Sequence, residues 1–195
     1  MKPFMTSLAL LAGVFSIYAQ DIPSSEAQIK SASMAAPEEM RDGVKVLGFS
    51  ADGELVELKK GTNELICIAD DPAQKGFNAA CYYKDLEPFM ARGRALKKEG
   101  KNFKEIFDIR EEEVKSGKLV IPQGSSLFVL SGPDEVFNTE TGEVTGAHLR
   151  SVVYIPYATT ESTGLPLKPA APGMPWIMDP GTHRAHIMIT PPKGD

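Results

Sequence analysis

The segment from Leu65 to Tyr83, LICIADDPAQKGFNAACYY, decides the fold, because it predicts an antiparallel pair of strands. Its two ends, 65–69 (LICIA) and 78–83 (NAACYY), have the apolar, β-branched and aromatic composition of short strands. The aspartates, the proline and the glycine between them are typical of a turn. We therefore expect a hairpin centred on Gln74.

The two cysteines of the chain occupy facing positions in this hairpin. A turn centred on Gln74 places Cys67 opposite Cys81, and opposed residues of antiparallel strands have Cα atoms about 4.5–5.5 Å apart, which a disulfide can bridge. An even number of cysteines in an oxidising compartment usually indicates disulfides. A redox-active pair is disfavoured, because the spacing is not the C-x-x-C that lowers a thiol pKa. The sequence predicts a Cys67–Cys81 disulfide.

The N-terminal segment indicates the oxidising compartment. Lys2 is followed by the apolar run 7–19 (SLALLAGVFSIYA), which ends in a small residue before a polar segment. This pattern predicts a signal peptide over 1–19, cleaved after Ala19. The run is shorter than the roughly 20 apolar residues that a membrane-spanning helix needs. We expect a secreted or periplasmic protein with no membrane span.

The charge pattern argues against nucleic acid or an anionic membrane as a partner. The chain of 195 residues has a net charge of −5, and without Lys2 of the predicted signal peptide the net charge is −6. Its basic residues form no stripe, and those at 92–101 are followed by the acidic residues of 105–113. We interpret both groups as solvated helix faces. Replacing Glu111 and Glu113 by Gln is then expected to change stability by no more than about 0.5 kcal/mol.

The pattern as a whole predicts an α+β fold: an antiparallel sheet of hairpins with a helical pair packed on one face. Residues 20–40 are expected to form a partly helical N-terminal arm, and 41–195 a single globular domain. Further strands are expected at 44–49, 54–58, 126–130, 149–157 and 187–189, and helices at 85–99 and 102–117.

The two predicted helices have recognisable start signals. Asp85 is a candidate N-cap of the first helix, and Asn102 with Glu105 forms a candidate capping box at the second. The segment 161–175 contains four prolines and two glycines, so regular structure is not expected there. A loop of this length in a compact domain is either functional or mobile.

The histidines raise the question of a metal site. His183 and His186, with Asp179 upstream, are ligand types that a metal site could use. In a strand, however, positions 183 and 186 point to opposite faces. We interpret His183 as a loop residue and His186 as a half-buried, hydrogen-bonded residue, and we expect no metal.

Other motifs are weaker. Asp70 and Asp71 could bind calcium, but they lack the EF-hand spacing and turn formation explains them. The triplet 124–126 (GSS) lacks the second glycine of a nucleophile elbow. No phosphate-binding or dinucleotide-binding loop occurs, and no cofactor is expected.

A small-ligand pocket is a further hypothesis. Trp176 is the sole tryptophan and ends the proline-rich segment, and His186 follows it on a predicted strand. With Tyr154 and Tyr157, these side chains could line an apolar pocket. The alternative is that Trp176 and His186 are packed core residues.

The chain resembles an uncharacterised family of secreted bacterial proteins over about residues 35–189. The residues that carry the resemblance are 35–37 (AAP), 43–46 (GVKV), 61–63 (GTN), Cys67, Pro72, Cys81, 175–178 (PWIM), 181–182 (GT) and 185–188 (AHIM). The chain departs from the family pattern at 64–66 (ELI), where a glycine and an aromatic residue are expected, and in its longer charged helix at 102–117. The resemblance implies a bacterial origin, export and the Cys67–Cys81 pairing, and it implies a site within 175–188.

These observations leave two hypotheses for function. The first is a non-catalytic exported module that binds a small ligand or a partner in the cell envelope. The second is a metal-dependent or acid–base enzyme of the cell envelope that uses His186 with His148 or Asp179. They differ in whether the fold brings these side chains within ligand distance of one another, roughly 4–5 Å.

Overall fold

The computed structural model describes residues 22–192, so the predicted signal peptide lies outside the described residues. The strands are β1 (Lys45–Phe49), β2 (Leu55–Lys59), β3 (Leu65–Ile68), β4 (Phe77–Tyr83), β5 (Ser126–Gly132), β6 (His148–Tyr154), β7 (Trp176–Met178) and β8 (His186–Ile189). The α-helices are α1 (Ser25–Ser33), α2 (Glu87–Lys98), α3 (Phe103–Lys115) and α4 (Thr160–Thr163). Single 3-10 helices form at Glu38–Gly43, Lys84–Leu86 and Asp134–Val136.

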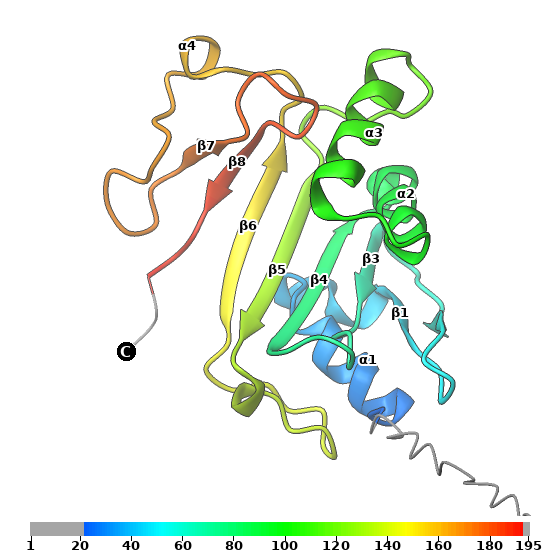
Figure 1. Ribbon diagram of the computed structural model, residues 1–195. Coiled ribbons are helices and arrows are strands. Elements are labelled where there is room, and N and C mark those ends of the chain that lie inside the picture. The colour runs from blue at the N-terminus through cyan, green and yellow to red at the C-terminus, as the bar shows by residue number, and fades with distance from the viewer. Residues whose placement is uncertain (1–21, 193–195) are drawn as a thin grey trace, which may run out of the picture.

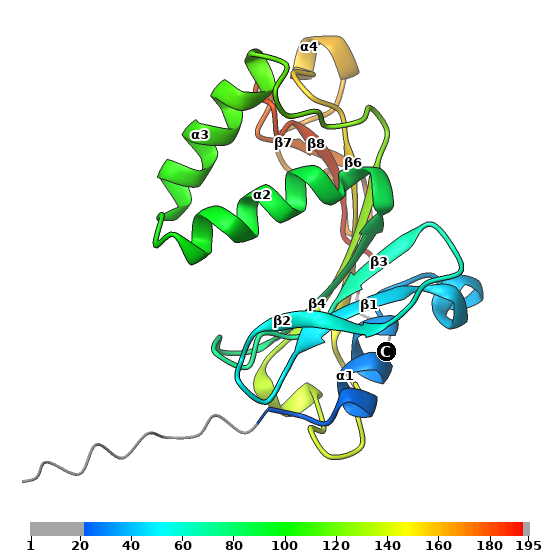
Figure 2. The same cartoon turned by 90° about the vertical axis from the view of Figure 1, so that its right-hand side faces the viewer.

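The strands form one open sheet in the order β2-β1-β3-β4-β5-β6-β8-β7 (Figure 1). All neighbouring pairs are antiparallel except β1 and β3. The α2–α3 pair lies on one side of the sheet and α1 on the other (Figure 2). The predicted α+β class is confirmed.

The predicted hairpin of residues 65–83 is present. In the β3–β4 register Cys67 is the partner of Cys81, and the two are joined by a disulfide with an S–S distance of 2.03 Å. The connecting loop uses its aspartates as turn residues: Asp71 Oδ1 accepts the Ala73 N–H at 3.0 Å, and Asp70 Oδ1 accepts the Asn78 N–H at 2.7 Å. The interpretation of these aspartates as turn residues is therefore confirmed.

The prediction of an entirely antiparallel sheet is wrong at one place. After β2 the chain returns so that Thr62 and Asn63 both donate their N–H groups to the Gly43 carbonyl, at 2.8 and 3.0 Å. This contact sets the start of β3 beside the start of β1, in the same direction. The two predicted hairpins consequently join through a parallel pair of strands.

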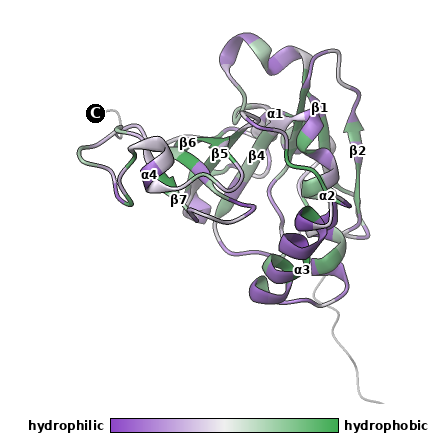
Figure 3. Ribbon diagram, turned by 90° about the horizontal axis from the view of Figure 1, so that it is seen from above, coloured by the Kyte–Doolittle hydropathy of each residue, from purple (hydrophilic) through white to green (hydrophobic). Residues whose placement is uncertain are grey.

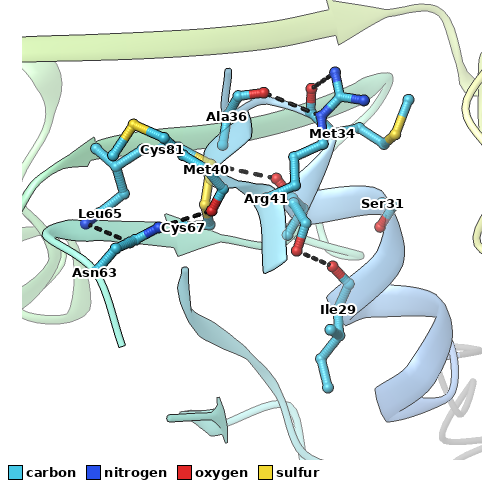
Figure 4. The surroundings of a disulfide bond; sticks show 12 residues. Ile29, Ser31, Met34, Ala36, Met40, Arg41, Asn63, Leu65, Cys67 and Cys81 are labelled. Atoms are coloured by element: carbon cyan, nitrogen blue, oxygen red, sulfur yellow. Dashed lines mark hydrogen bonds between the residues drawn. A yellow bond between two sulfur atoms is a disulfide. The ribbon is translucent and has the colours of Figure 1, made fainter. Parts of the chain in front are cut away.

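One face of the sheet, the α1 face, is covered by the N-terminal helix. Ala32, Val46 and Cys81 are among its fully buried residues, and the small side chains of α1 let the helix approach the disulfide closely (Figure 4). The buried Gln28 amide bonds the backbone of β1: it donates to the Phe49 carbonyl at 2.9 Å and accepts the Phe49 N–H at 2.7 Å. Residues 25–33 thus belong to the core.

The opposite face, here called the helix-pair face, is covered by α2 and α3. Phe89 of α2 is buried there with Tyr82, Leu127 and Val152 of the sheet. The two helices approach closely at Gly93, where a Cβ atom would lie 2.9 Å from Arg110 Nη1. Polar and apolar residues alternate along both helices, as expected for helices with one buried side (Figure 3).

The helix starts agree with the sequence in one case of two. Asn102 Oδ1 accepts the Glu105 N–H at 3.0 Å and Glu105 Oε2 accepts the Asn102 N–H at 2.9 Å, so the capping box of α3 is confirmed. Asp85 as the N-cap of α2 is wrong. Lys84–Leu86 forms a 3-10 turn, and the helix begins only after it.

The C-terminal edge of the sheet holds an unpredicted strand. Residues 176–178 form β7, whose outer side is met by the preceding loop: the Ile177 N–H donates to the Pro166 carbonyl at 3.0 Å. The prediction that 161–175 lacks regular structure is wrong for 161–163, which belong to α4, whereas residues 164–175 lack helix and strand, as expected from their prolines and glycines. Within residues 22–192, no helix is both long enough and apolar enough to cross a membrane.

Candidate functional site

Three of the four predicted pocket residues share one sheet face. In the register of the last strands, Trp176 is the partner of Met188, and His186 is the partner of both Met178 and Tyr154. Cross-strand partners point to the same side of a sheet. Trp176, His186 and Tyr154 therefore all lie on the helix-pair face, and the Tyr154 and His186 ring centroids are 5.7 Å apart.

His186 is held by the protein itself. The residue is 4% exposed, so it is buried and not half-buried as predicted, and its Nδ1 donates to the Arg184 carbonyl oxygen at 2.6 Å, as expected of a hydrogen-bonded residue. Burial lowers the pKa of His186, and the bond to the carbonyl offsets this only in part. A neutral, hydrogen-bonded ring of this kind is typical of a packed residue.

Of the other predicted site residues, Tyr157 and His148 lie elsewhere, whereas Asp179 follows Met178, the register partner of His186, and its negative charge acts on the His186 ring. Tyr157 follows β6 on an exposed loop and adopts a positive φ of 62°. His148 begins β6, six positions before Tyr154, so it lies roughly 20 Å from the His186 end of the sheet. Asp179 Oδ2 lies 3.5 Å from Arg184 Nε, in an ion pair. Residues 22–192 contain no group of three His, Cys, Asp or Glu side chains that could hold a metal ion.

His183 forms a buried pair with Glu111 that was not predicted from the sequence. The His183 side chain is fully buried, and its Nδ1 lies 2.5 Å from Glu111 Oε2. The same oxygen accepts the His183 backbone N–H at 2.9 Å. This pair fastens the β7–β8 loop to α3, beside Phe89 and Phe107, whose rings pack edge-on against the imidazole.

The interpretation of the acidic residues of α3 as a solvated face is wrong for two of them. The side chains of Glu111 and Glu113 are only 13% and 12% exposed. Both carboxylate oxygens of Glu113 share the Arg92 Nε–H, each at 3.0 Å from Nε. Glu111 stands four residues after Phe107 and three before Val114, on the apolar stripe of the helix, and this spacing was the available signal.

The protonation states of the pair follow from its surroundings. Burial lowers the pKa of His183, and this effect outweighs that of the Glu111 carboxylate, which raises it. Burial raises the pKa of Glu111, but the bonds from the His183 backbone and ring, with one from Lys115, outweigh it and leave the pKa below its ordinary value. We infer a neutral His183 that donates its Nδ1–H to a charged Glu111. Its Nε2 is buried without a hydrogen-bond partner among the residues described.

The two buried histidines predict that acid destabilises the protein. The pKa values of His183 and His186 are lowered in the folded state. As the pH falls below about 6.5, the unfolded chain therefore binds protons that the folded chain does not, and stability decreases. Each histidine contributes a slope of at most about 1.4 kcal/mol per pH unit. Urea unfolding at about pH 7.5, 6.5 and 5.5 measures this slope, and a stability that rises toward about pH 5.5 would contradict the assignment.

A cleft of about 810 Å³ opens on another part of the helix-pair face, over strands β1 to β4. The floor consists of Phe49, Leu55, Ile68 and Ala80, one from each of the four adjacent strands β1, β2, β3 and β4. Phe49 is the register partner of Leu55, and Ile68 is the partner of Ala80, so the two side chains of each pair lie on the same face of the sheet. All four line the cleft. This volume falls within the range of small-molecule pockets.

The C-terminal half of α2 forms the roof of this cleft, above β2 and β4 (Figure 2). Arg94, Lys97 and Lys98 are spaced three and four residues apart and therefore share one side of the helix. Arg94 is fixed at the inner end, where it donates to Glu87 at 2.6 Å and to the Tyr82 hydroxyl at 3.2 Å. Cations thus stand where a packed helix would carry apolar side chains.

Two ion pairs close the rim of the cleft. Lys98 Nζ lies 2.7 Å from Glu54 of the β1–β2 turn, and Lys97 Nζ lies 3.2 Å from Asp71 of the β3–β4 loop. Asp70 also lines the cleft; burial raises its pKa, and the bond from the Asn78 N–H offsets part of this. The cleft therefore has an apolar floor and a rim with charges of both signs.

The sequence carried only a weak signal for this cleft. The basic residues of α2 are typical of a solvated helix face. No local pattern indicates that this face lies over a sheet. Comparison of the chain with models of protein families, with curated proteins and with solved structures finds no match. The assignment of function thus depends on the geometry of the chain.

Proposed function

We propose that this protein is a non-catalytic module, exported to the periplasm or the exterior of a bacterial cell, that binds a small ligand. The observation that carries the proposal is the cleft between α2 and the four strands β1 to β4. Apolar side chains floor it, and charged side chains that could orient a ligand surround it, which is the usual composition of a small-molecule site.

The packing of the two candidate regions favours the cleft over the Trp176 region as the main binding site. Tyr154 and His186 are buried and pack against each other, and Trp176, which is partly buried, packs against the same core. The cleft residues Leu55, Ile68 and Ala80 are each only partly buried by the protein. A ligand can cover this remaining apolar surface without displacing the core.

Anilinonaphthalene sulfonate, a dye with an apolar body and one anionic group, tests the proposal. We expect the purified protein to bind one dye molecule per chain with increased fluorescence, because the floor removes the apolar body from water. Ala80→Trp fills the floor and should abolish binding. Leu55→Gln, which replaces an apolar floor residue by a polar one, should weaken it about tenfold.

Ala170→Trp is the matched control, because Ala170 is exposed on the proline-rich loop, away from the cleft residues. It should bind the dye as the wild type does. Circular dichroism and thermal unfolding establish that each variant is folded. Unchanged dye binding by folded Ala80→Trp and Leu55→Gln would place the binding outside the cleft and overturn the proposal.

A further inference from the structure

The two ion pairs of the cleft stand at two separate loops beside its floor, on the edge of the sheet where β1 and β3 end. One ion pair, Lys98–Glu54, lies at the β1–β2 turn, and the other, Lys97–Asp71, lies at the β3–β4 loop. The lysine side chains are 75% and 62% exposed. Exposed pairs of this kind contribute little to stability, so a ligand can replace either partner at low cost.

The signs of these charges balance. Lys75, Lys97 and Lys98 face Glu54, Asp70 and Asp71 around the cleft, whereas the remaining cation, Arg94, is paired with Glu87. An anion or a cation that opened both rim pairs would leave protein charges of one sign without partners. A ligand with one charge of each sign would pair with one lysine and one carboxylate, and the lysine and carboxylate that remain have opposite signs and can pair with each other, which favours a dipolar ligand.

The length of the floor sets the length of the ligand. The floor residues lie on four adjacent strands, and three spacings of about 4.8 Å give a floor of about 14 Å. An extended peptide advances about 3.3–3.6 Å per residue, so about four residues span this distance. Peptide side chains of apolar type would cover Phe49, Leu55, Ile68 and Ala80.

We propose that the cleft binds short apolar peptides of about four residues with free termini. The inference rests on the proposed function, because it names the ligand class of the same cleft. The peptide lies across the floor, and its terminal ammonium and carboxylate groups take the places of Lys97 or Lys98 and of Asp71 or Glu54 in the two rim pairs.

Calorimetric titration with three probes tests this ligand class. The probes are leucyl-alanyl-leucyl-alanine with free termini, the same peptide with an acetylated N-terminus and an amidated C-terminus, and octanoate. We expect the free peptide to bind at least about tenfold more tightly than the blocked peptide or octanoate. The double variant Lys97→Gln, Lys98→Gln should lose about tenfold in affinity for the free peptide.

Lys104→Gln is the matched control. Lys104 also forms an exposed ion pair, with Asp108 at 2.5 Å, but it lies on α3 outside the cleft. Its replacement should leave the affinity unchanged. Equal affinity for the blocked peptide, tighter binding of octanoate, or peptide binding that survives Ala80→Trp would each overturn the inference. If the wild type binds the dye but not the peptide, the ligand class alone is overturned. If it binds neither, the proposed function is overturned as well.

Discussion

Glu111→Ala is expected to lower the free energy of unfolding by about 3 kcal/mol, because it leaves two buried donors without an acceptor. These donors are the His183 backbone N–H and the His183 ring Nδ1–H, both bonded to Glu111 Oε2. Urea unfolding at about pH 7.5 measures the loss. Glu111→Gln keeps one carbonyl acceptor and should lose less.

Glu112→Ala is the control for this experiment. Its side chain is 78% exposed on the same helix and pairs only loosely with Lys115, at 3.5 Å. We expect a change within about 0.5 kcal/mol, as for surface substitutions in general. If Glu111→Ala changed stability as little as Glu112→Ala does, the assignment of a buried Glu111–His183 pair would be wrong. The interpretation of the α3 carboxylates as a solvated helix face would then be correct.

Replacing both cysteines by alanine is expected to cost about 3 kcal/mol of unfolding free energy. The disulfide joins residues 14 positions apart, and in the chain-entropy model closing such a loop restricts the unfolded chain by about that amount. Denaturant unfolding of Cys67→Ala, Cys81→Ala against the wild type measures the difference.

Reducing agent supplies the control for the cysteine variant. Reduction should lower the stability of the wild type toward that of the double variant, and it should leave the double variant unchanged. A wild type whose unfolding midpoint is insensitive to reductant, with two titratable thiols in the denatured unreduced protein, would contradict the disulfide.

The elements that the sequence predicted well are the ones that local residues determine. The hairpin around Gln74 follows from turn residues between two apolar runs, and its register follows from the loop length. The capping box of Asn102 and Glu105 is likewise contained within four residues. In both cases the interacting groups are near neighbours in the chain, so their pattern is visible in the sequence.

The features that the sequence did not predict depend on contacts between distant segments. The parallel pairing of β1 with β3 depends on the Gly43 carbonyl meeting the N–H groups of Thr62 and Asn63. The Glu111–His183 pair joins residues 72 positions apart. The cleft exists because α2 overhangs four strands whose order no local pattern specifies. Such contacts become visible only once the topology is known.

The assignment of the binding site can be tested most directly by methyl and indole NMR spectra recorded during a titration with anilinonaphthalene sulfonate. We predict chemical-shift changes at the methyl groups of Leu55, Ile68 and Ala80, which form the floor of the cleft. The Trp176 indole and the Met188 methyl should be unaffected, because they lie near the other edge of the sheet. Changes at Trp176 and Met188, with none at Ile68 and Ala80, would contradict the cleft as the binding site.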